Sequence, residues 1–308
     1  MVLPATGLAR RAISVSDPVP VLVNRSGGTA SSKGDKLGPE LEAAFAQAGV
    51  AIDLQLVEGK EIEAALKKVA DRPLVVIGGG DGTLGRMAGI LAEKGSTLGI
   101  LPLGTRNHLA RELGVPLDIP GAAALIASGT TRKIDLARVN GQAFVNNASI
   151  GLYPQLVRER EQRDTPKWLA TLPATIAALR RVKHHRLNLA IPGNDSNIVT
   201  PMLFVGNNRY TLEAGQLGTR EALDGGVLSV FAVASRRRWA LIGFAIRTLF
   251  GHADRDRDFA AIAEAPSFEV SGRSDDIDIA LDGEVMTLDM PLRFECQSGA
   301  LTVAAPPV

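Results

Sequence analysis

Val75-Val76-Ile77-Gly78-Gly79-Gly80-Asp81-Gly82-Thr83-Leu84 is the stretch around which the rest of the chain is organised. Its first part is continuously apolar, as expected for a parallel strand that helices cover on both faces. The glycines permit a sharp turn and a close approach of backbone to a ligand, because they lack a Cβ atom. A turn that leads into a helix leaves backbone N–H groups unpaired, and such groups bind phosphate. The stretch therefore predicts a strand, a phosphate-binding turn and a helix in succession.

Asp81 is unexpected in such a turn, because a carboxylate repels phosphate. The repulsion is removed when a metal ion lies between the two groups, or when the carboxylate takes up a proton during a reaction. A purely structural alternative makes Asp81 or Thr83 the N-cap of the following helix. The turn lacks the Gly-Lys-Ser/Thr ending of a Walker A loop, and its glycine spacing differs from that of a Rossmann loop.

Strands and helices alternate over residues 19–129, which predicts a doubly wound α/β domain over residues 19–132. The expected strands are residues 19–23, 52–57, 74–77 and 98–101. Ligands of such sheets bind beyond the carboxyl ends of the strands. Segments 24–28, 78–83 and 102–107 all follow expected strands. We therefore expect these segments to meet in one crevice.

After about residue 130 the pattern changes to short alternating strands, and Asn140-Gly141 between two apolar runs predicts a hairpin. The expected strands include residues 187–191, 202–205, 227–234, 277–281, 292–296 and 301–303, and helices are expected around 166–182 and 237–250. This pattern predicts an antiparallel, sandwich-like β domain over residues 133–308. Its C-terminal segment is a candidate to pack back on the first domain, and residues 1–18 are expected to form a loose tail.

Composition restricts the possible functions. The chain has 308 residues, 45% of them hydrophobic, so it can bury the cores of two domains. Its net charge of +1 argues against general nucleic-acid binding, which needs a broad basic face. Cys296 is the only cysteine, which excludes an intramolecular disulfide. We see neither a signal peptide nor a membrane-spanning apolar run, and we expect a cytoplasmic protein.

Several motifs occur together in a characteristic order. They are Asn-x-Ser-Gly from Asn24, Gly-Gly-Asp-Gly-Thr from Gly79, Pro-Leu-Gly-Thr-x-Asn-x-x-Ala-Arg from Pro102, the run 146–152, Val205-Gly206-Asn207-Asn208, and Leu281-Asp282-Gly283-Glu284. In this order they resemble the diacylglycerol kinase catalytic-domain family, which includes soluble bacterial lipid kinases, sphingosine kinases and ceramide kinase. The resemblance spans roughly residues 19–306. It implies ATP-dependent phosphorylation of a lipid hydroxyl, in a cleft between an α/β domain and a β-sandwich.

The resemblance also implies roles for individual residues. The nucleotide phosphates would be bound by Asn24, Ser26, Gly27, Gly79, Gly80, Asp81, Gly82, Thr83 and Thr105, with Asn107 shaping the same pocket. Asp81 would hold the catalytic Mg²⁺ through water. Glu284 would be the general base that takes the proton from the acceptor hydroxyl, although Asp81 is an alternative for that role. Glu284 and Asp81 are thus the predicted catalytic residues.

The chain departs from the family pattern at several positions. Asp224 lies where bacterial relatives bind a structural Mg²⁺, but Gly225 replaces the second Asp of their motif, so Asp224 is either a metal ligand or a turn residue. His108 replaces a frequent Asp, Gly85-Arg86 replaces Asn-Glu, and Arg25 replaces Pro. These changes leave the expected phosphate-binding groups in place. They bear on which acceptor the protein uses and on the residues that surround the site.

Alternatives remain open for a basic segment and for the activity. Arg236-Arg237-Arg238-Trp239, with the apolar residues up to 250, is either a helix that packs on the β domain or a transient membrane-surface contact of a peripheral protein. A lipid kinase with a diacylglycerol-like acceptor is the leading hypothesis. An NAD kinase shares Gly79 to Thr83 and is an alternative, and a non-catalytic nucleotide-binding protein of the same fold is another.

Overall fold

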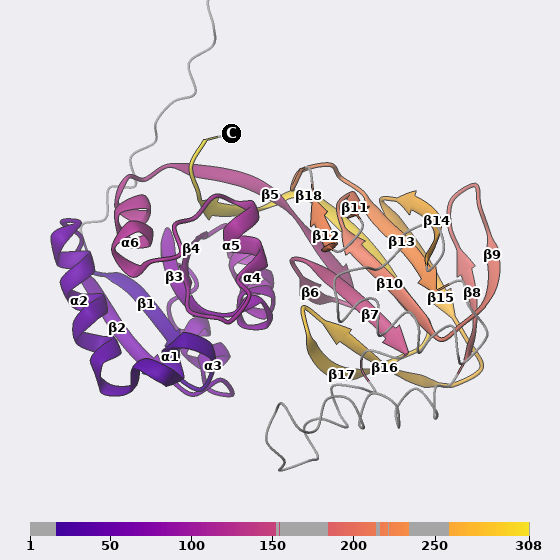
Figure 1. Ribbon diagram of the computed structural model, residues 1–308, viewed down its shortest axis with the longest axis horizontal. Helices are drawn as coiled ribbons and strands as arrows, with labels where there is room; N and C mark the ends of the chain where they lie inside the picture. Colours follow the sequence, from indigo (N-terminus) through magenta and orange to yellow (C-terminus); the bar gives the residue numbers. More distant parts are fainter. Residues whose placement is uncertain are drawn as a thin grey trace, which may run out of the picture. The chain divides into compact units, whose positions relative to one another are not determined.

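The computed structural model describes residues 17–151, 154, 184–213, 216–220, 222–233 and 259–307 (Figure 1). The chain divides into a first unit, Met1–Lys133 with Leu301–Val308, and a second unit, Ile134–Ala300. Three expected features lie outside the described residues: the tail up to residue 16, the helix around 166–182 and the basic segment 236–250. In the part of the chain that the structure describes, no helix is long and apolar enough to cross a membrane.

The first unit contains a parallel sheet in the order β2-β1-β3-β4, formed by β1 (Val19–Asn24), β2 (Ile52–Val57), β3 (Leu74–Gly79) and β4 (Thr97–Pro102). The end of β18 (Leu292–Ala304) extends this sheet, because Thr302 and Val303 pair in parallel with Thr97 and Leu98 of β4. Strands β3 and β4 are buried along their whole length. Their continuous apolar sequences follow from helices that cover both faces of the sheet.

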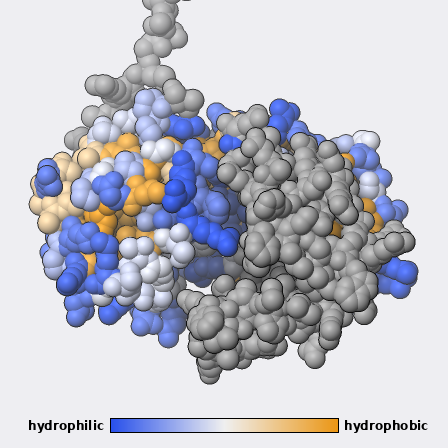
Figure 2. Space-filling view, in the orientation of Figure 1, coloured by the Kyte–Doolittle hydropathy of each residue, from blue (hydrophilic) through white to orange (hydrophobic). Residues whose placement is uncertain are grey.

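The helices of the first unit form two layers. They are α1 (Gly28–Lys33), α2 (Leu37–Gln47), α3 (Ile62–Lys67), α4 (Asp81–Lys94), α5 (His108–Glu112) and α6 (Ile119–Ala127), with a 3₁₀ turn η1 (Gly34–Lys36) before α2. Helices α2 and α6 contact each other and strands β2 and β4, whereas α3 and α4 contact each other and strands β1 and β3. The predicted doubly wound α/β domain is confirmed. On the face drawn in Figure 2, hydrophilic and hydrophobic residues of this unit are intermixed.

The second unit is built from antiparallel strands. One sheet has the order β14-β13-β10-β7-β16-β17, and the start of β18 pairs with β15, which continues to β8 and β9. The strands not yet given are β7 (Asn147–Gly151), β8 (His185–Ala190), β9 (Ser196–Thr200), β10 (Met202–Asn207), β13 (Leu228–Val233), β14 (Phe259–Ala265), β15 (Ser267–Ser271), β16 (Asp276–Leu281) and β17 (Glu284–Asp289). The described part of the chain also contains two hairpins: β5 (Thr131–Val139) with β6 (Gln142–Phe144), and β11 (Tyr210–Glu213) with β12 (Gln216–Arg220). The predicted antiparallel β domain is confirmed.

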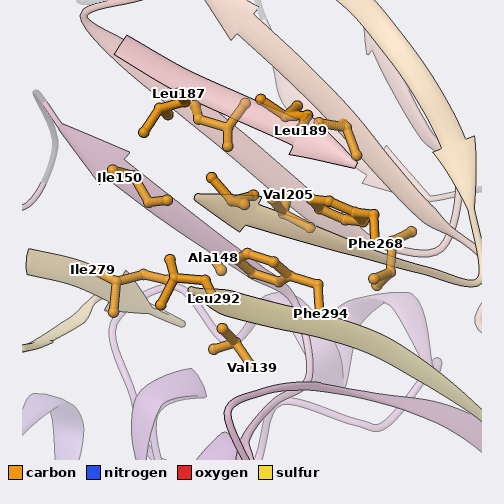
Figure 3. Close-up of a cluster of buried hydrophobic side chains, with 14 of the residues drawn as sticks. Val139, Ala148, Ile150, Leu187, Leu189, Val205, Phe268, Ile279, Leu292 and Phe294 are labelled. Atoms are coloured by element: carbon orange, nitrogen blue, oxygen red, sulfur yellow. The ribbon is translucent and has the colours of Figure 1, made fainter. Parts of the chain in front are cut away.

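The core of the second unit lies between its two sheets (Figure 3). Ala148, Ile150 and Ile279 come from the six-stranded sheet, and they face Phe268 and Phe294 of the other sheet. The rings of Phe268 and Phe294 are stacked, with centroids 4.8 Å apart and an interplanar angle of 7°. The alternation of buried and exposed residues along β8 follows from this one-sided burial.

Strand β18 differs from the sequence-based expectation, because residues 292–296 and 301–303 belong to one strand of 13 residues. The polar residues between the two apolar segments suggested a break. They continue the strand, and β18 forms backbone pairs with β5, β15 and β4, which do not depend on side-chain polarity.

Candidate functional site

The loops after β1, β3 and β4 leave one edge of the parallel sheet, because these strands are adjacent. The Thr29 N–H donates to the Leu103 carbonyl at 2.9 Å. A Cβ atom on Gly28 would overlap that carbonyl and lie 2.9 Å from Gly104 Cα, and one on Gly104 would overlap Gly80 Cα. The loops therefore pack backbone against backbone, and glycine is required where they touch. The expected meeting of the segments 24–28, 78–83 and 102–107 is found in the structure.

Asn24 links two of these loops through its side chain. Its Nδ2 donates to Thr83 Oγ1 at 3.2 Å, and its Oδ1 accepts from the Ser26 N–H at 3.0 Å. Ser26 and Gly27 are exposed beside it, whereas Thr83 is buried. Asn24 thus holds the loops in place, and Ser26 and Gly27 are among the exposed residues of this turn.

The first turn of α4 presents backbone N–H groups at the meeting point. Gly80 is the N-cap and provides no side-chain hydrogen bond, so the N–H groups of Asp81, Gly82 and Thr83 have no capping side chain. Helix α4 has 14 residues, and the partial positive charge of its N-terminus favours an anion. This end of α4 fits phosphate oxygens.

Asp81 is the first residue of α4 but does not cap that helix. Its Oδ2 accepts from the His108 N–H at 3.1 Å, and its Oδ1 accepts from the Leu109 N–H at 3.0 Å. The carboxylate therefore caps α5 and joins the loop after β3 to the loop after β4. The structural alternative from the sequence expected Asp81 to cap α4. The Asp81 side chain does cap a helix, but that helix is α5.

Asn107 shapes the loop after β4. It has a φ angle of 52° and is buried, and its Oδ1 accepts from the Gly104 N–H at 2.9 Å. Its Nδ2 donates to the carbonyls of Pro102 at 3.1 Å and Gly104 at 3.0 Å. These bonds keep the loop curved and leave the side chain of Thr105 exposed beside Asn107.

The second unit carries the other predicted catalytic residue. Asp282 and Gly283 form a two-residue turn between β16 and β17, with φ angles of 48° and 93°, and Glu284 pairs with Leu281. Positive φ at both positions is the requirement of a type I′ hairpin. Glu284 is half-buried at the start of β17.

The Asp282 carboxylate accepts three backbone hydrogen bonds from one segment. Its Oδ2 accepts from the Val145 N–H at 2.8 Å, and its Oδ1 accepts from the N–H groups of Asn146 at 2.7 Å and Asn147 at 3.1 Å. Reasoning from the sequence did not assign this role. The signal available was the occurrence of the run 146–152 and of Asp-Gly-Glu among the same motifs.

Asp224 lies in the loop after β12, and its side chain is exposed. The neighbouring loop atoms are held by protein groups, because the Gly225 N–H donates to Asn208 Oδ1 and the Gly226 N–H donates to Asp135 Oδ2, both at 2.6 Å. Over the described ranges, no group of three or more His, Cys, Asp and Glu residues is placed to hold a metal ion. Among the described residues, no such group supplies further ligands for a metal ion at Asp224.

Asp135 also affects Cys296. The Asp135 carboxylate is buried, and the Cys296 Sγ donates to its Oδ2 at 3.8 Å. Burial of the thiol, followed by the nearby negative charge and this hydrogen bond, raises the pKa of Cys296 to about 12. The thiol therefore stays protonated at neutral pH, which makes Cys296 a poor nucleophile.

The comparisons with known proteins agree with the motifs. Residues 18–139 match the family model described as the diacylglycerol kinase catalytic domain. A Pseudomonas aeruginosa protein named "Probable lipid kinase YegS-like" is 33% identical over 250 residues, which cover 80% of this chain and 80% of that protein. A Bacillus subtilis diacylglycerol kinase is 39% identical over 118 residues, covering 37% of this chain and 36% of that protein. The crystal structure of a diacylglycerol kinase from Bacillus anthracis has the same fold, with a TM-score of 0.66 at 23% identity, covering 94% of this chain and 97% of that one.

Proposed function

The chain belongs to the diacylglycerol kinase catalytic-domain family, and on this premise we propose that it is an ATP- and Mg²⁺-dependent lipid kinase. It transfers the γ-phosphate of ATP to the hydroxyl group of a lipid, with a diacylglycerol-like molecule as the acceptor. Membership of a kinase family supports phosphoryl transfer in general. ATP, the lipid class and the residue roles are the parts that we propose.

The main support from the structure is the meeting of glycine-containing loops at one edge of the parallel sheet. A Cβ atom on Gly28 or Gly104 would overlap the backbone of a neighbouring loop, and one on Gly80 would lie 3.3 Å from Gly104 Cα. The uncapped start of α4 lies in one of these loops. Backbone N–H groups bind phosphate oxygens without adding charge, so this edge suits the phosphates of a nucleotide.

In the proposed reaction, the oxygen of the acceptor hydroxyl forms a bond to the γ-phosphorus, and the bond from that phosphorus to the bridging oxygen of ADP breaks. The hydroxyl proton passes to the carboxylate of Glu284. Phosphoryl transfer needs positioning, charge neutralisation and a place for this proton more than covalent help from the protein. Asp282 is not assigned this role, because its oxygens accept hydrogen bonds from the backbone of another segment.

The residues present fit a magnesium ion held mainly by phosphates and water. Each Asp81 oxygen accepts one backbone hydrogen bond and retains a second lone pair, which can accept from a metal-bound water. Mg²⁺ keeps several waters and usually takes one or two carboxylates, so a protein cage is unnecessary. When bound, the ion neutralises the charge of the transferring phosphate. Asp81 would orient its water shell while holding α5.

A screen of ATP consumption tests the proposal. The acceptors are diacylglycerol, phosphatidylglycerol, ceramide, sphingosine, undecaprenol and NAD, each with and without Mg²⁺. We expect Mg²⁺-dependent turnover with a lipid. Phosphorylation of NAD alone would establish the NAD kinase alternative, and ATP binding without turnover of any acceptor would favour the non-catalytic alternative.

We also propose a cytoplasmic location with transient contact to anionic membranes through the basic segment 236–250, which lies outside the described residues. The support is its sequence alone: three arginines followed by Trp239 and further apolar residues. Co-sedimentation with vesicles that contain anionic lipid should fall when these arginines are replaced by glutamine. Equal binding of the two proteins would contradict the proposed contact.

A further inference from the structure

The segment 145–147 is held from both sides of its backbone. On the N–H side, all three residues donate to the Asp282 carboxylate. On the carbonyl side, Val145 accepts from Arg220 Nη1 at 2.6 Å and from Asn207 Nδ2 at 3.0 Å. The Asn146 carbonyl accepts from the Tyr210 hydroxyl at 2.9 Å. The backbone of this segment is therefore held by hydrogen bonds on both its N–H and its carbonyl side.

This arrangement places opposite charges at the two ends of the same peptide group. The Val145 carbonyl and the Asn146 N–H belong to one planar unit, and they point in opposite directions. A guanidinium group donates at one end, and a carboxylate accepts at the other. Val145 and Asn146 are buried, so both hydrogen bonds are stronger than they would be in water.

The turn that carries Glu284 is attached to this segment. Beyond the carboxylate contacts, the Asp282 N–H donates to the Asn147 carbonyl at 2.9 Å, and β16 pairs with β7 up to Leu281 and Ala148. Gly283, which follows, has no side chain to restrain it. Glu284 itself pairs with Leu281, so the Asp282 carboxylate adds to this strand pairing by holding the turn before Glu284 against the segment 145–147.

We infer that Asp282 is a positioning residue for Glu284. Its carboxylate binds the segment 145–147 and so holds the 282–283 turn, which precedes Glu284, in place. This inference rests on the proposed function, because Glu284 is the base only if the chain is a kinase. Asp282 does not itself take up the proton. Its carboxylate already accepts three backbone hydrogen bonds, which is a holding role.

The hairpin of β5 and β6 provides a matched control. Asn140 is also the first residue of a two-residue turn, with a φ angle of 46°, and Gly141 follows it. Its side chain also binds backbone groups, since Oδ1 accepts from the Arg293 N–H and Nδ2 donates to the Asp289 carbonyl, both at 2.8 Å. Asp282→Gly and Asn140→Gly each remove such bonds from a turn residue with positive φ, and glycine tolerates that conformation.

The first measurement is amide hydrogen exchange, which needs no substrate. In Asp282→Gly, the amides of residues 145–147 should exchange at least about tenfold faster than in the parent protein, because they lose their acceptor. In Asn140→Gly, those amides should keep their protection. Unchanged protection in Asp282→Gly would overturn the inference, whatever the activity of the protein.

The second measurement is steady-state kinetics with the lipid that the screen identifies. We expect kcat to fall about 100-fold in Asp282→Gly, the scale on which a misplacement of about 1 Å acts, with KM for ATP within about twofold. Asp282→Asn keeps the turn and one acceptor oxygen, so its kcat should fall less. Asn140→Gly should keep the parental kcat at a temperature where both variants are folded.

The two hypotheses fail in different ways. Normal turnover in Glu284→Gln would refute the assignment of Glu284 as the base. The proposed role of Asp282 would then fail as well, even if the exchange result is as expected. A parental kcat in Asp282→Gly, together with an inactive Glu284→Gln, would leave the kinase proposal intact and overturn the positioning role. Equal losses of kcat in Asp282→Gly and Asn140→Gly would show a general effect of hairpin stability and would also overturn it.

Discussion

Replacement of Asp81 by asparagine should have two separable effects. In the proposed reaction Asp81 organises the metal, so Asp81→Asn should abolish turnover. In the structure its carboxylate also caps α5 through the N–H groups of His108 and Leu109. The fold should therefore form but with lower stability, and the loss of stability should be measurable without substrate.

The size of the stability loss follows from these contacts. A hydrogen bond to a charged group contributes about 1.5–3 kcal/mol, and a favourable charge near a helix N-terminus contributes about 0.3–1 kcal/mol. Asparagine keeps one acceptor oxygen and places an NH₂ group against the other N–H. Asp81 is half-buried, so water replaces part of what is lost. We expect Asp81→Asn to lower the free energy of unfolding by about 2 kcal/mol, or the Tm of the whole chain by about 3 °C.

The assay is thermal unfolding of the full chain in buffer without nucleotide or Mg²⁺, combined with turnover at a temperature well below both transitions. Asp118→Ala is the control, because Asp118 caps α6 and its Oδ1 accepts from the Gly121 N–H at 2.7 Å. Removing this cap should cost about 1 kcal/mol and leave turnover unchanged. A parental Tm in Asp81→Asn would refute the capping argument, and parental turnover would refute the role in the reaction.

Three further outcomes are expected. Glu284→Gln should lose turnover while keeping ATP affinity, because the expected phosphate-binding groups lie in the other unit. Turnover near the parental rate would contradict the role of Glu284 as the base. Gly104→Ala should weaken ATP binding at least about tenfold, because the added Cβ would overlap Gly80 Cα and push the loops apart; calorimetric titration measures this, and unchanged affinity would count against the loop edge as the nucleotide site. Cys296 should resist thiol reagents at pH 8, because its pKa is raised from 9.0 to about 12. Between these two pH values the folded protein keeps the thiol proton, whereas the unfolded chain loses it. Stability should therefore fall between about pH 9 and 12 in the parent but less in Cys296→Ala, as measured by denaturant titration, and equal pH dependence in both would contradict the shift.

Much of the first unit could be predicted from local patterns. Apolar segments indicated the parallel strands, and the glycine turn after residue 77 indicated that a helix follows, which begins at Asp81 in the structure. The meeting of the loops followed from the rule that parallel strands share a carboxyl edge. The single strand β18 was not predictable in this way, because it is continued by backbone pairing with β5, β15 and β4, which side-chain patterns do not reveal.

The stretch from Val75 to Leu84 determined by its own chemistry that a buried strand ends in a turn with exposed backbone N–H groups and enters a helix. The roles of the acids were decided only by the tertiary structure. Asp81 binds backbone groups 27 and 28 residues away, and Asp282 binds N–H groups 135 to 137 residues away. Propensity and periodicity describe neighbours along the chain, whereas a carboxylate accepts from whichever donors the fold brings within about 3 Å. The sequence thus determined which residues could bind phosphate or take up a proton, and the packing of distant segments decided where their side chains are directed.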